Sequence, residues 1–197
     1  MGVFSRLMIN ISGGVSGAIT DENTYEAQKY AIEAYERIRN EKYDINRIVR
    51  NTGFDRQDIK TIKDYLFYEK ILEDENGNLR RFDPDFYIAQ SWTRLSNEPS
   101  KIQNHDITLI NHELMEMKLI ESGYSQYEAH NITSEKYNYN VEAQQYYHDI
   151  EKKQKRKGKE TELTTELYDE LDRLRNEMEK REDIRQEKER KKQNGAY

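Results

Sequence analysis

Apolar residues recur at every third or fourth position along most of the chain, and this spacing marks one face of an α-helix. The first segment with this pattern has Ala27, Ala31, Ala34 and Ile38 on one face, and Asn23 with Glu26 predicts where the helix begins. We therefore expect a mainly α-helical protein in which small side chains let a neighbouring helix approach this face closely.

Two further helical segments follow between positions 44 and 70, and the sequence Asn51-Thr52-Gly53-Phe54 separates them. The apolar positions of the first are Ile45, Ile48 and Val49, and those of the second are Ile59, Ile62, Leu66 and Phe67. Two such segments around a glycine turn are typical of a helix-turn-helix unit. The N-terminal half is therefore predicted to be helix-turn-helix-like.

A β-hairpin is predicted directly after this unit, because Asn76-Gly77 is a strong hairpin turn. A winged helix that regulates transcription is one interpretation, with Lys60 and Lys63 as duplex contacts. The same helix carries Asp55, Asp58 and Asp64. These acids would lie beside phosphates in a groove, which favours plain helical packing over DNA binding.

The next helix is expected to start at Asp83, a good cap, with Pro84 in the first helical position. Its apolar stripe comprises Ile88, Trp92 and Leu95. Trp92 is the only tryptophan in the chain, and we interpret it as an anchor of the core.

The stretch from position 104 to 148 holds all four histidines. A helix is predicted from Ile107 to Ile120, capped by Asp106 and ended near Gly123. At about 100° per residue, its polar residues His112, Glu113 and Glu116 share a sector with Leu109 and Ile120. This sector is not purely polar, so burial is expected, and buried carboxylates must be paired, protonated or bound to a metal.

Ser125 and Glu128 form the capping-box pattern of a second helix, which carries His130 in its first turns. The short link through Gly123 predicts a central helical hairpin that brings His130 towards the acids of the first helix. The hypothesis is a site made of His112, Glu113, Glu116 and His130. It would bind a divalent metal or serve as general acid and base on a phosphodiester.

Two observations limit this hypothesis. The sequence HELME resembles the zinc motif H-E-x-x-H but has Glu116 where the second histidine is required, which argues against a zincin. A structural interpretation stays open beside the catalytic one: Glu113 or Glu116 pairs with a core arginine, and His130 packs or caps.

The composition gives a polar chain of 197 residues with 36% charged and 35% hydrophobic side chains, a mean hydropathy of -1.15 and a net charge of -6. This charge argues against nucleic-acid binding over the whole surface but allows a local basic patch. No cysteine is present, which excludes disulfides and thiolate metal sites. The apolar run from Leu7 to Ile11 is too short to span a bilayer. We expect a soluble, intracellular protein without membrane contact.

Three regions follow from these patterns: a flexible leader at 1–20, a helical domain at 21–150 and a charged helical tail at 151–197. The tail begins with the candidate nucleic-acid contacts Lys152, Lys153, Lys155, Arg156 and Lys157. A solvated linker is the alternative interpretation of these residues. Further on, Leu167, Leu171, Leu174 and Met178 recur at spacings of 4, 3 and 4. A long charged helix is expected, with a homo-oligomer through it as one option.

The segments RRFDPDFYIAQSWTRL and HDITLINHELMEMKLIESGYSQYEAHNITSEKYNYN carry a resemblance. The chain resembles a family of uncharacterised proteins from phages and mobile elements of Gram-positive bacteria, which occur free-standing and as extensions of phage minor head proteins. The resemblance covers about residues 14 to 150. It implies a mobile-element setting, in which nuclease effectors and anti-CRISPR-like proteins that disarm host defence are common.

Together these features predict a phage or mobile-element protein of the host bacterial cytoplasm, which acts against host defence through nucleic acid or a nucleoprotein complex of the host. In the nuclease version, Glu113 or Glu116 is the general base and His112 or His130 the general acid. A divalent metal is a candidate cofactor whose identity the sequence does not give. The alternatives are a non-catalytic virion-assembly or protein-interaction module, which would use the charged tail and the tyrosine surface, and the winged-helix regulator.

Overall fold

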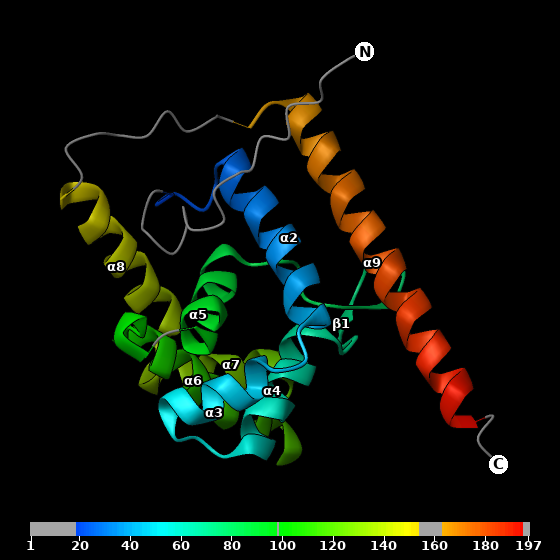
Figure 1. Cartoon of the computed structure of the whole chain (residues 1–197), viewed down its shortest axis with the longest axis horizontal. Coiled ribbons are helices and arrows are strands. Elements are labelled where there is room, and N and C mark those ends of the chain that lie inside the picture. Colours follow the sequence, from blue (N-terminus) through cyan, green and yellow to red (C-terminus); the bar gives the residue numbers. More distant parts are fainter. Residues whose placement is uncertain (1–18, 98, 154–162, 195–197) are drawn as a thin grey trace.

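A computed structural model describes residues 19–97, 99–153 and 163–194, and most of these residues are helical (Figure 1). The prediction of a mainly α-helical protein is confirmed. In chain order the elements are α2 (Tyr25–Asn40), α3 (Asp44–Thr52), α4 (Arg56–Phe67), β1 (Leu72–Glu73), β2 (Leu79–Arg80), α5 (Phe86–Ser96), the 3-10 helix η1 (Pro99–Lys101), α6 (Asn104–Glu121), α7 (Gln126–Lys136), α8 (Tyr139–Lys153) and α9 (Thr165–Asn194). Within the described residues, no helix is long and apolar enough to cross a membrane.

Helix α2 lies at the centre of the fold and packs against α4, α5 and α9. Its alanines Ala27, Ala31 and Ala34 are fully buried, as their spacing predicted. The helix cap differs from the expectation. Thr24, and not Asn23, accepts a hydrogen bond from the backbone N–H of Ala27, because the helix begins one residue later.

Helices α3 and α4 form the predicted helix-turn-helix, and the antiparallel strands β1 and β2 follow as a hairpin. Gly53 ends α3 with a φ of 79°, a backbone conformation that favours glycine. The expectation that Lys63 could contact DNA is wrong. Its side chain is buried, and its Nζ donates to the carboxylate of Asp44 at 2.8 Å. Trp92 is a core anchor, as predicted, and its indole N–H donates to the same carboxylate at 2.9 Å.

Helix α5 begins two residues later than its pattern suggested. Asp85, and not Asp83, is the helix cap and accepts a hydrogen bond from the backbone N–H of Ile88 at 2.7 Å. Asp83 instead pairs with Arg80 across 2.9 Å at the surface. Aspartates two residues apart both satisfy the capping rule, so the sequence pattern did not choose between them.

Asp106 also has a different place from the one predicted. Helix α6 starts at Asn104, and Asp106 stands in its first turn, where it accepts a hydrogen bond from the backbone N–H of Gln103 at 2.8 Å. The same carboxylate holds the guanidinium of Arg94 with two hydrogen bonds of 2.9 and 2.6 Å. Both side chains are fully buried, so this pair links α5 to α6 inside the core.

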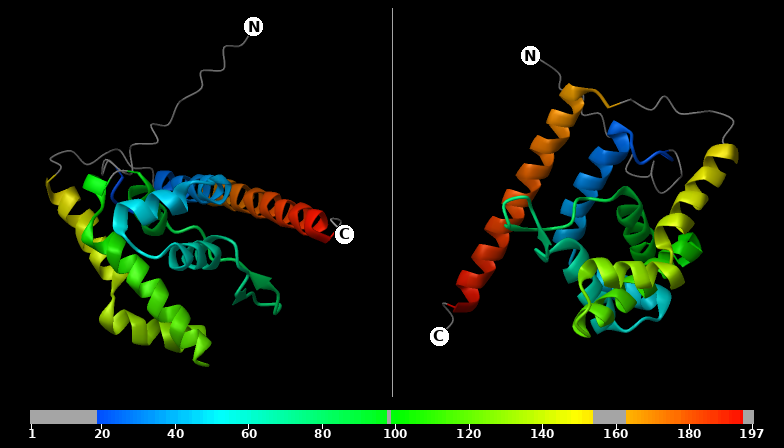
Figure 2. Two further views of the ribbon diagram at one scale, coloured as in Figure 1. Left: turned by 60° about the horizontal axis from the view of Figure 1, so that its bottom comes forward. Right: turned by 180° about the vertical axis from the view of Figure 1, so that it is seen from behind.

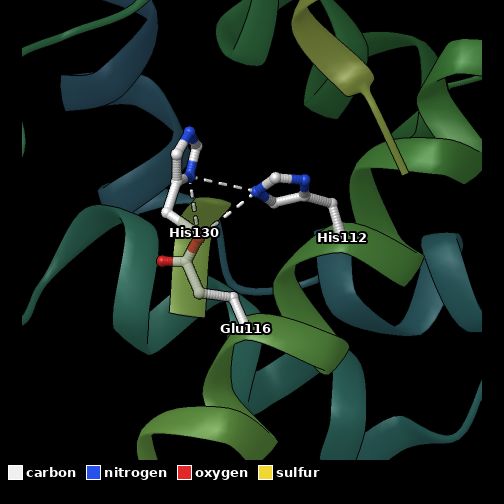
Figure 3. A group of neighbouring side chains, drawn as sticks. All are labelled: His112, Glu116 and His130. Atoms are coloured by element: carbon white, nitrogen blue, oxygen red, sulfur yellow. Dashed lines mark hydrogen bonds and ion pairs between the residues drawn. The ribbon is translucent and has the colours of Figure 1, made fainter. Parts of the chain in front are cut away.

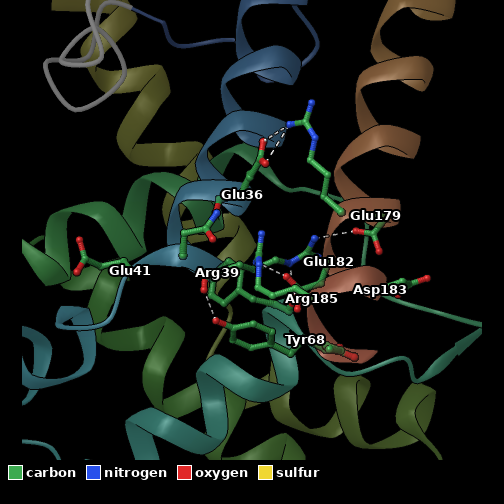
Figure 4. A network of polar contacts seen from close by, with 12 residues as sticks. Glu36, Arg39, Glu41, Tyr68, Glu179, Glu182, Asp183 and Arg185 are labelled. Carbon is green, nitrogen blue, oxygen red and sulfur yellow. Dashed lines mark hydrogen bonds and ion pairs between the residues drawn. The ribbon is translucent and has the colours of Figure 1, made fainter. Parts of the chain in front are cut away.

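Helix α9 runs beside α2, as Figures 1 and 2 both show. Leu171 and Met178 are buried in this contact. The apolar stripe of α9 that was considered for a homo-oligomer therefore packs against its own chain. Figure 4 shows the polar part of the contact, in which Glu179 accepts hydrogen bonds from the buried Arg39 at 2.9 Å and Arg81 at 2.6 Å. Ion pairs therefore hold much of α9 against the fold.

The candidate nucleic-acid contacts fall partly outside the described residues. Lys152 and Lys153 form the exposed C-terminal end of α8. Lys155, Arg156 and Lys157 lie outside the residues that the structure describes, as does most of the leader predicted at 1–20.

Candidate metal centre

The predicted central hairpin is formed by α6 and α7, which pack closely against each other. The turn between them contains Gly123 with a φ of 99°. Ser125 then opens α7 with the capping box predicted from its sequence: its side chain caps the backbone N–H of Glu128, and the Glu128 carboxylate accepts from the backbone N–H of Ser125. This local geometry fixes where α7 starts and directs His130 towards α6 (Figure 3).

The polar sector of α6 faces the protein interior. Its members Leu109, His112, Glu113 and Glu116 are all buried. On the other face Ile110 is fully buried, but Ile107, Leu114 and Met117 are only partly buried. The helix thus buries two carboxyl groups while it leaves apolar side chains near its surface, which is costly unless those carboxyl groups have a task or a partner.

Three side chains converge at the polar sector, as Figure 3 shows. Glu116 Oε2 lies 3.2 Å from His112 Nε2 and 2.9 Å from His130 Nδ1. The two ring nitrogens are 3.3 Å apart. His112 and Glu116 are buried, whereas the side chain of His130 is 53% exposed, so the cluster is open to solvent on the side of α7.

The other ring nitrogen of His112 fixes how this ring can act. Nδ1 lies 2.7 Å from the carbonyl oxygen of Tyr137, and a carbonyl only accepts, so Nδ1 carries the proton. In a neutral ring, the lone pair of Nε2 then points at the Glu116 carboxylate. Two acceptors face each other at that point, and a cation, either a proton or a metal ion, is needed between them.

The pKa shifts of His112 and Glu116 agree with a cation between the two groups. Burial opposes protonation of His112, but its hydrogen bonds to Glu116 and Tyr137 outweigh burial and raise its pKa. Burial likewise works to raise the pKa of Glu116, but hydrogen bonds from His112, Tyr65 and His130 lower it on balance. Tyr65 donates from α4 to Glu116 Oε1 at 2.7 Å. Glu116 is therefore an ionised carboxylate held in a fixed orientation by a helix distant in sequence.

Glu113 has a different environment from Glu116. It is 6% exposed, and within the described part of the chain it forms no hydrogen bond or ion pair. Burial, reinforced by the charge of Glu116 and opposed by that of His112, raises the pKa of Glu113 to about 8. The alternative that either acid pairs with a core arginine is wrong for the described residues. Arg94 instead pairs with Asp106.

A cavity of about 440 Å³ lies beside the cluster, and Glu113 lines it together with His112, Glu116 and His130. Its remaining wall contains acidic and aromatic side chains, including Glu22, Asp83, Asp85, Tyr35, Phe82 and Tyr139. No lysine or arginine is among the described residues that line it. All four predicted site residues thus meet at one cavity.

The trio has the spacing of metal ligands. Four ligands at about 2.0 to 2.1 Å from Zn²⁺ in a tetrahedron are about 3.3 Å apart. The separations of 2.9 to 3.3 Å among the three converging atoms are close to this value. The hydrogen bonds from His112 to Tyr137 and from Tyr65 to Glu116 supply the outer support that such ligands usually have. The set is two histidines and one glutamate, with room for a further ligand towards the cavity.

The other two histidines lie apart from this centre. His105 accepts a hydrogen bond from Arg94 at 2.7 Å, and burial lowers its pKa to about 4, so it is a neutral member of the core. His148 is exposed on α8. No local sequence pattern indicates that Tyr65 and the Tyr137 carbonyl contact the centre, because tertiary packing places the elements that bring them there.

Comparison with known proteins adds no further constraint. No family model, no curated protein and no solved structure matches this chain. The geometry of the centre is therefore the basis on which a function can be assigned.

Proposed function

We propose that the protein is a metal-dependent hydrolase in which His112, Glu116 and His130 hold a divalent ion and Glu113 accepts a proton from the attacking water. The observation that carries the proposal is the convergence of three ligand atoms beside a buried, unpartnered carboxyl group on one cavity. A purely structural cluster has no need of the fourth group.

The order of these residues along α6 supports the assignment. In the H-E-x-x-H motif, the first and fifth residues bind zinc and the second is the general base. In this chain the first, second and fifth positions are His112, Glu113 and Glu116. The fifth position supplies a carboxylate, and His130 from α7 supplies the second imidazole. Two histidines and a glutamate form a known catalytic zinc set, so the departure from the motif at Glu116 is balanced by His130.

The residues around the proposed metal site have distinct roles in hydrolysis. A bound divalent ion would act as a Lewis acid and make a coordinated water more acidic. Glu113 lies next to the ligands, and a pKa of about 8 lets this group both take and return a proton near neutral pH. Tyr65 and the Tyr137 carbonyl keep the ligands oriented. Because the ring of His130 is exposed, solvent and substrate can reach the metal site from the side of α7.

The setting we propose is the one that the family resemblance implies: a phage or mobile-element protein that acts against host defence. In this setting the candidate substrate is a nucleic acid or a nucleoprotein of the host, so the bond that is hydrolysed is a phosphodiester or an amide. The first turn of α8 lines the cavity, and the exposed Lys152 and Lys153 end the same helix about 18 Å further along. A polyanion that follows α8 would contact both.

A non-catalytic interaction module is the second candidate. The exposed tyrosines Tyr124 and Tyr127, which are 46% and 73% exposed, favour it because they lie together where α6 passes into α7. Such rings are common anchors of protein interfaces. In this case the residues of the metal centre would be dispensable for function, and alanine at His130 would have no effect on partner binding.

Metal binding is the first test. Equilibrium dialysis against Zn²⁺, Mn²⁺ or Co²⁺, with the Co²⁺ absorption spectrum as a report on coordination, should give one ion per chain. His130→Ala should abolish this binding, and the matched control His148→Ala, which removes an exposed imidazole from α8, should retain it. A chain that binds none of these ions above the level of the His130→Ala variant would overturn the proposal.

Activity is the second test. The metal-loaded protein should be incubated with labelled RNA, single-stranded DNA, duplex DNA and a peptide mixture. Glu113→Gln should bind the ion normally but lose at least 100-fold in rate on whichever polymer is cleaved. Equal rates for Glu113→Gln and the parent chain would remove Glu113 from the mechanism.

A further inference from the structure

The wall of the cavity carries more negative charge than the metal centre uses. Glu22 comes from the segment before α2, and Asp83 and Asp85 come from the segment between β2 and α5. These two segments are far apart in sequence and are brought to the same cavity by the packing of α2 against α5. The side chains that would bind the metal belong to α6 and α7. The acidic wall is therefore a separate part of the cavity.

Little on the protein itself balances this charge. Among the described residues, no hydrogen bond or ion pair reaches the Glu22 carboxyl group, and burial together with the nearby Asp85 raises its pKa. Asp85 accepts the capping hydrogen bond of Ile88, and burial raises its pKa as well. Only Asp83 is balanced, because it pairs at the surface with Arg80 across 2.9 Å and with Arg175 across 3.9 Å. Repulsion between the ionised Glu22 and Asp85 is relieved either by protonation of one of them or by a cation that enters the cavity.

A second observation shows that the cavity is built for a ligand. Glu113 lines it, is 6% exposed, and forms no hydrogen bond or ion pair among the described residues. Its carboxyl oxygens keep contact with the cavity, and the hydroxyl of Tyr35 on the same wall is fully buried without a hydrogen-bond partner among the described residues. A buried polar group without a partner is rare in folded proteins. Tyr35, Phe82 and Tyr139 add aromatic rings to the same wall, and aromatic rings attract cations.

The geometry points to a cationic group, an alkylammonium or guanidinium, as the ligand that this cavity accepts next to the metal centre. The volume of about 440 Å³ is in the range of small-molecule sites and would admit a lysine or arginine side chain or a short polyamine. This inference rests on the proposed function only for the statement that the bound molecule is also the substrate; the binding itself needs no metal.

The negative charge of the cavity discriminates between anionic and cationic substrates. A phosphodiester would enter a cavity with five carboxyl groups and without a described lysine or arginine, which disfavours it unless the metal compensates. A peptide with a basic side chain beside the bond to be cut would instead match the wall. Within a host nucleoprotein, the charge of the cavity wall thus favours an amide bond of the protein part over a phosphodiester of the nucleic acid.

Binding can be measured directly by titration calorimetry, first on the metal-free protein in EDTA and then on the Zn²⁺-loaded protein. The probes are N-acetyl-arginine amide, its neutral analogue N-acetyl-citrulline amide, N-acetyl-glutamate amide and spermidine. We expect the arginine amide to bind at least 10-fold more tightly than the citrulline amide, with no detectable binding of the glutamate amide. Tighter binding of spermidine than of the arginine amide would assign the cavity to polyamines, which is the same chemistry from another source.

Two variants test whether the arginine amide binds at the acidic wall of the cavity. Glu22→Gln should weaken binding of the arginine amide at least 5-fold, and Glu33→Gln, which removes an exposed carboxylate of α2 that does not line the cavity, should leave it unchanged. Equal binding of the arginine and citrulline amides, or equal effects of the two variants, would overturn the inference even if the metal binds. Selective binding in a chain that fails to bind metal would support the cation cavity and refute the hydrolase.

Discussion

Replacement of Glu113 by glutamine offers a direct measurement of how this carboxyl group is held. The side chain keeps its shape but no longer titrates. In the parent chain the folded protein holds the Glu113 proton up to a pH of about 8, whereas the unfolded chain releases it near the ordinary value of 4.5. Because the folded-state pKa is the higher one, the contribution of Glu113 to stability is complete below pH 4.5 and is lost as the pH rises towards 8.

The size of this loss follows from the two pKa values. Each pH unit between them is worth about 1.4 kcal/mol, so the parent chain should lose about 5 kcal/mol from this group between pH 4.5 and 8. Entry of water and local relaxation around Glu113 reduce this loss of stability, so we expect a loss of about 3 to 5 kcal/mol. This is a large part of the 5 to 15 kcal/mol that typically stabilises a domain.

The assay is urea unfolding of the metal-free proteins, followed by the fluorescence of the buried Trp92, at intervals between pH 4.5 and 9. Glu113→Gln should gain stability relative to the parent chain as the pH rises. The control Glu33→Gln, a change at an exposed position of α2, should follow the parent chain. If the stability of Glu113→Gln and that of the parent chain change in parallel over this range, Glu113 is either solvated or paired and cannot be the proton acceptor that we propose.

Three further predictions test the support of the centre and of α9. Tyr65→Phe removes the hydrogen bond to Glu116 and should weaken Zn²⁺ binding about 10-fold, measured by competition with a chelator, because outer hydrogen bonds orient ligands. Zn²⁺ at 100 times its dissociation constant should raise the free energy of unfolding by about 2.7 kcal/mol, and His130→Ala should abolish this gain. Glu179→Gln leaves two buried arginines of the α9 contact without a shared partner and should cost about 3 kcal/mol in urea unfolding, whereas the exposed Glu177→Gln should cost less than about 1 kcal/mol.

Features encoded within a few residues were predicted correctly from the sequence. The capping box at Ser125 and the turn at Gly53 depend on local backbone geometry, and both occur as expected. The common sector of His112, Glu113 and Glu116 follows from the 100° step of a helix and needs no knowledge of the fold. The hairpin then placed His130 correctly, because a short link leaves two helices few ways to pack.

The errors occur where two local solutions are equally good or where a distant element decides. Asp83 and Asp85 are equal candidates for a helix cap, and packing around α5 selects the second. Lys63 has the sequence context of a surface residue, but the carboxylate of Asp44, 19 positions earlier in the chain, draws it into the core. Tyr65 reaches Glu116 across 51 positions, and no local pattern encodes that approach. Side-chain pairing between elements is set by the tertiary fold.

The other buried acids of helix α6 have partners, so the fold can provide partners for carboxyl groups along this helix. Two turns before Glu113, Asp106 is fully buried and fully satisfied, with the Arg94 guanidinium on both oxygens and the backbone N–H of Gln103 on one. One turn after it, Glu116 is satisfied by two imidazoles and a tyrosine. Between these two acids, Glu113 remains buried without a partner and lowers stability above pH 4.5. A carboxyl group kept in such a state beside three converging ligands indicates a chemical role, because any partner that relieved the cost would also remove its capacity to accept a proton.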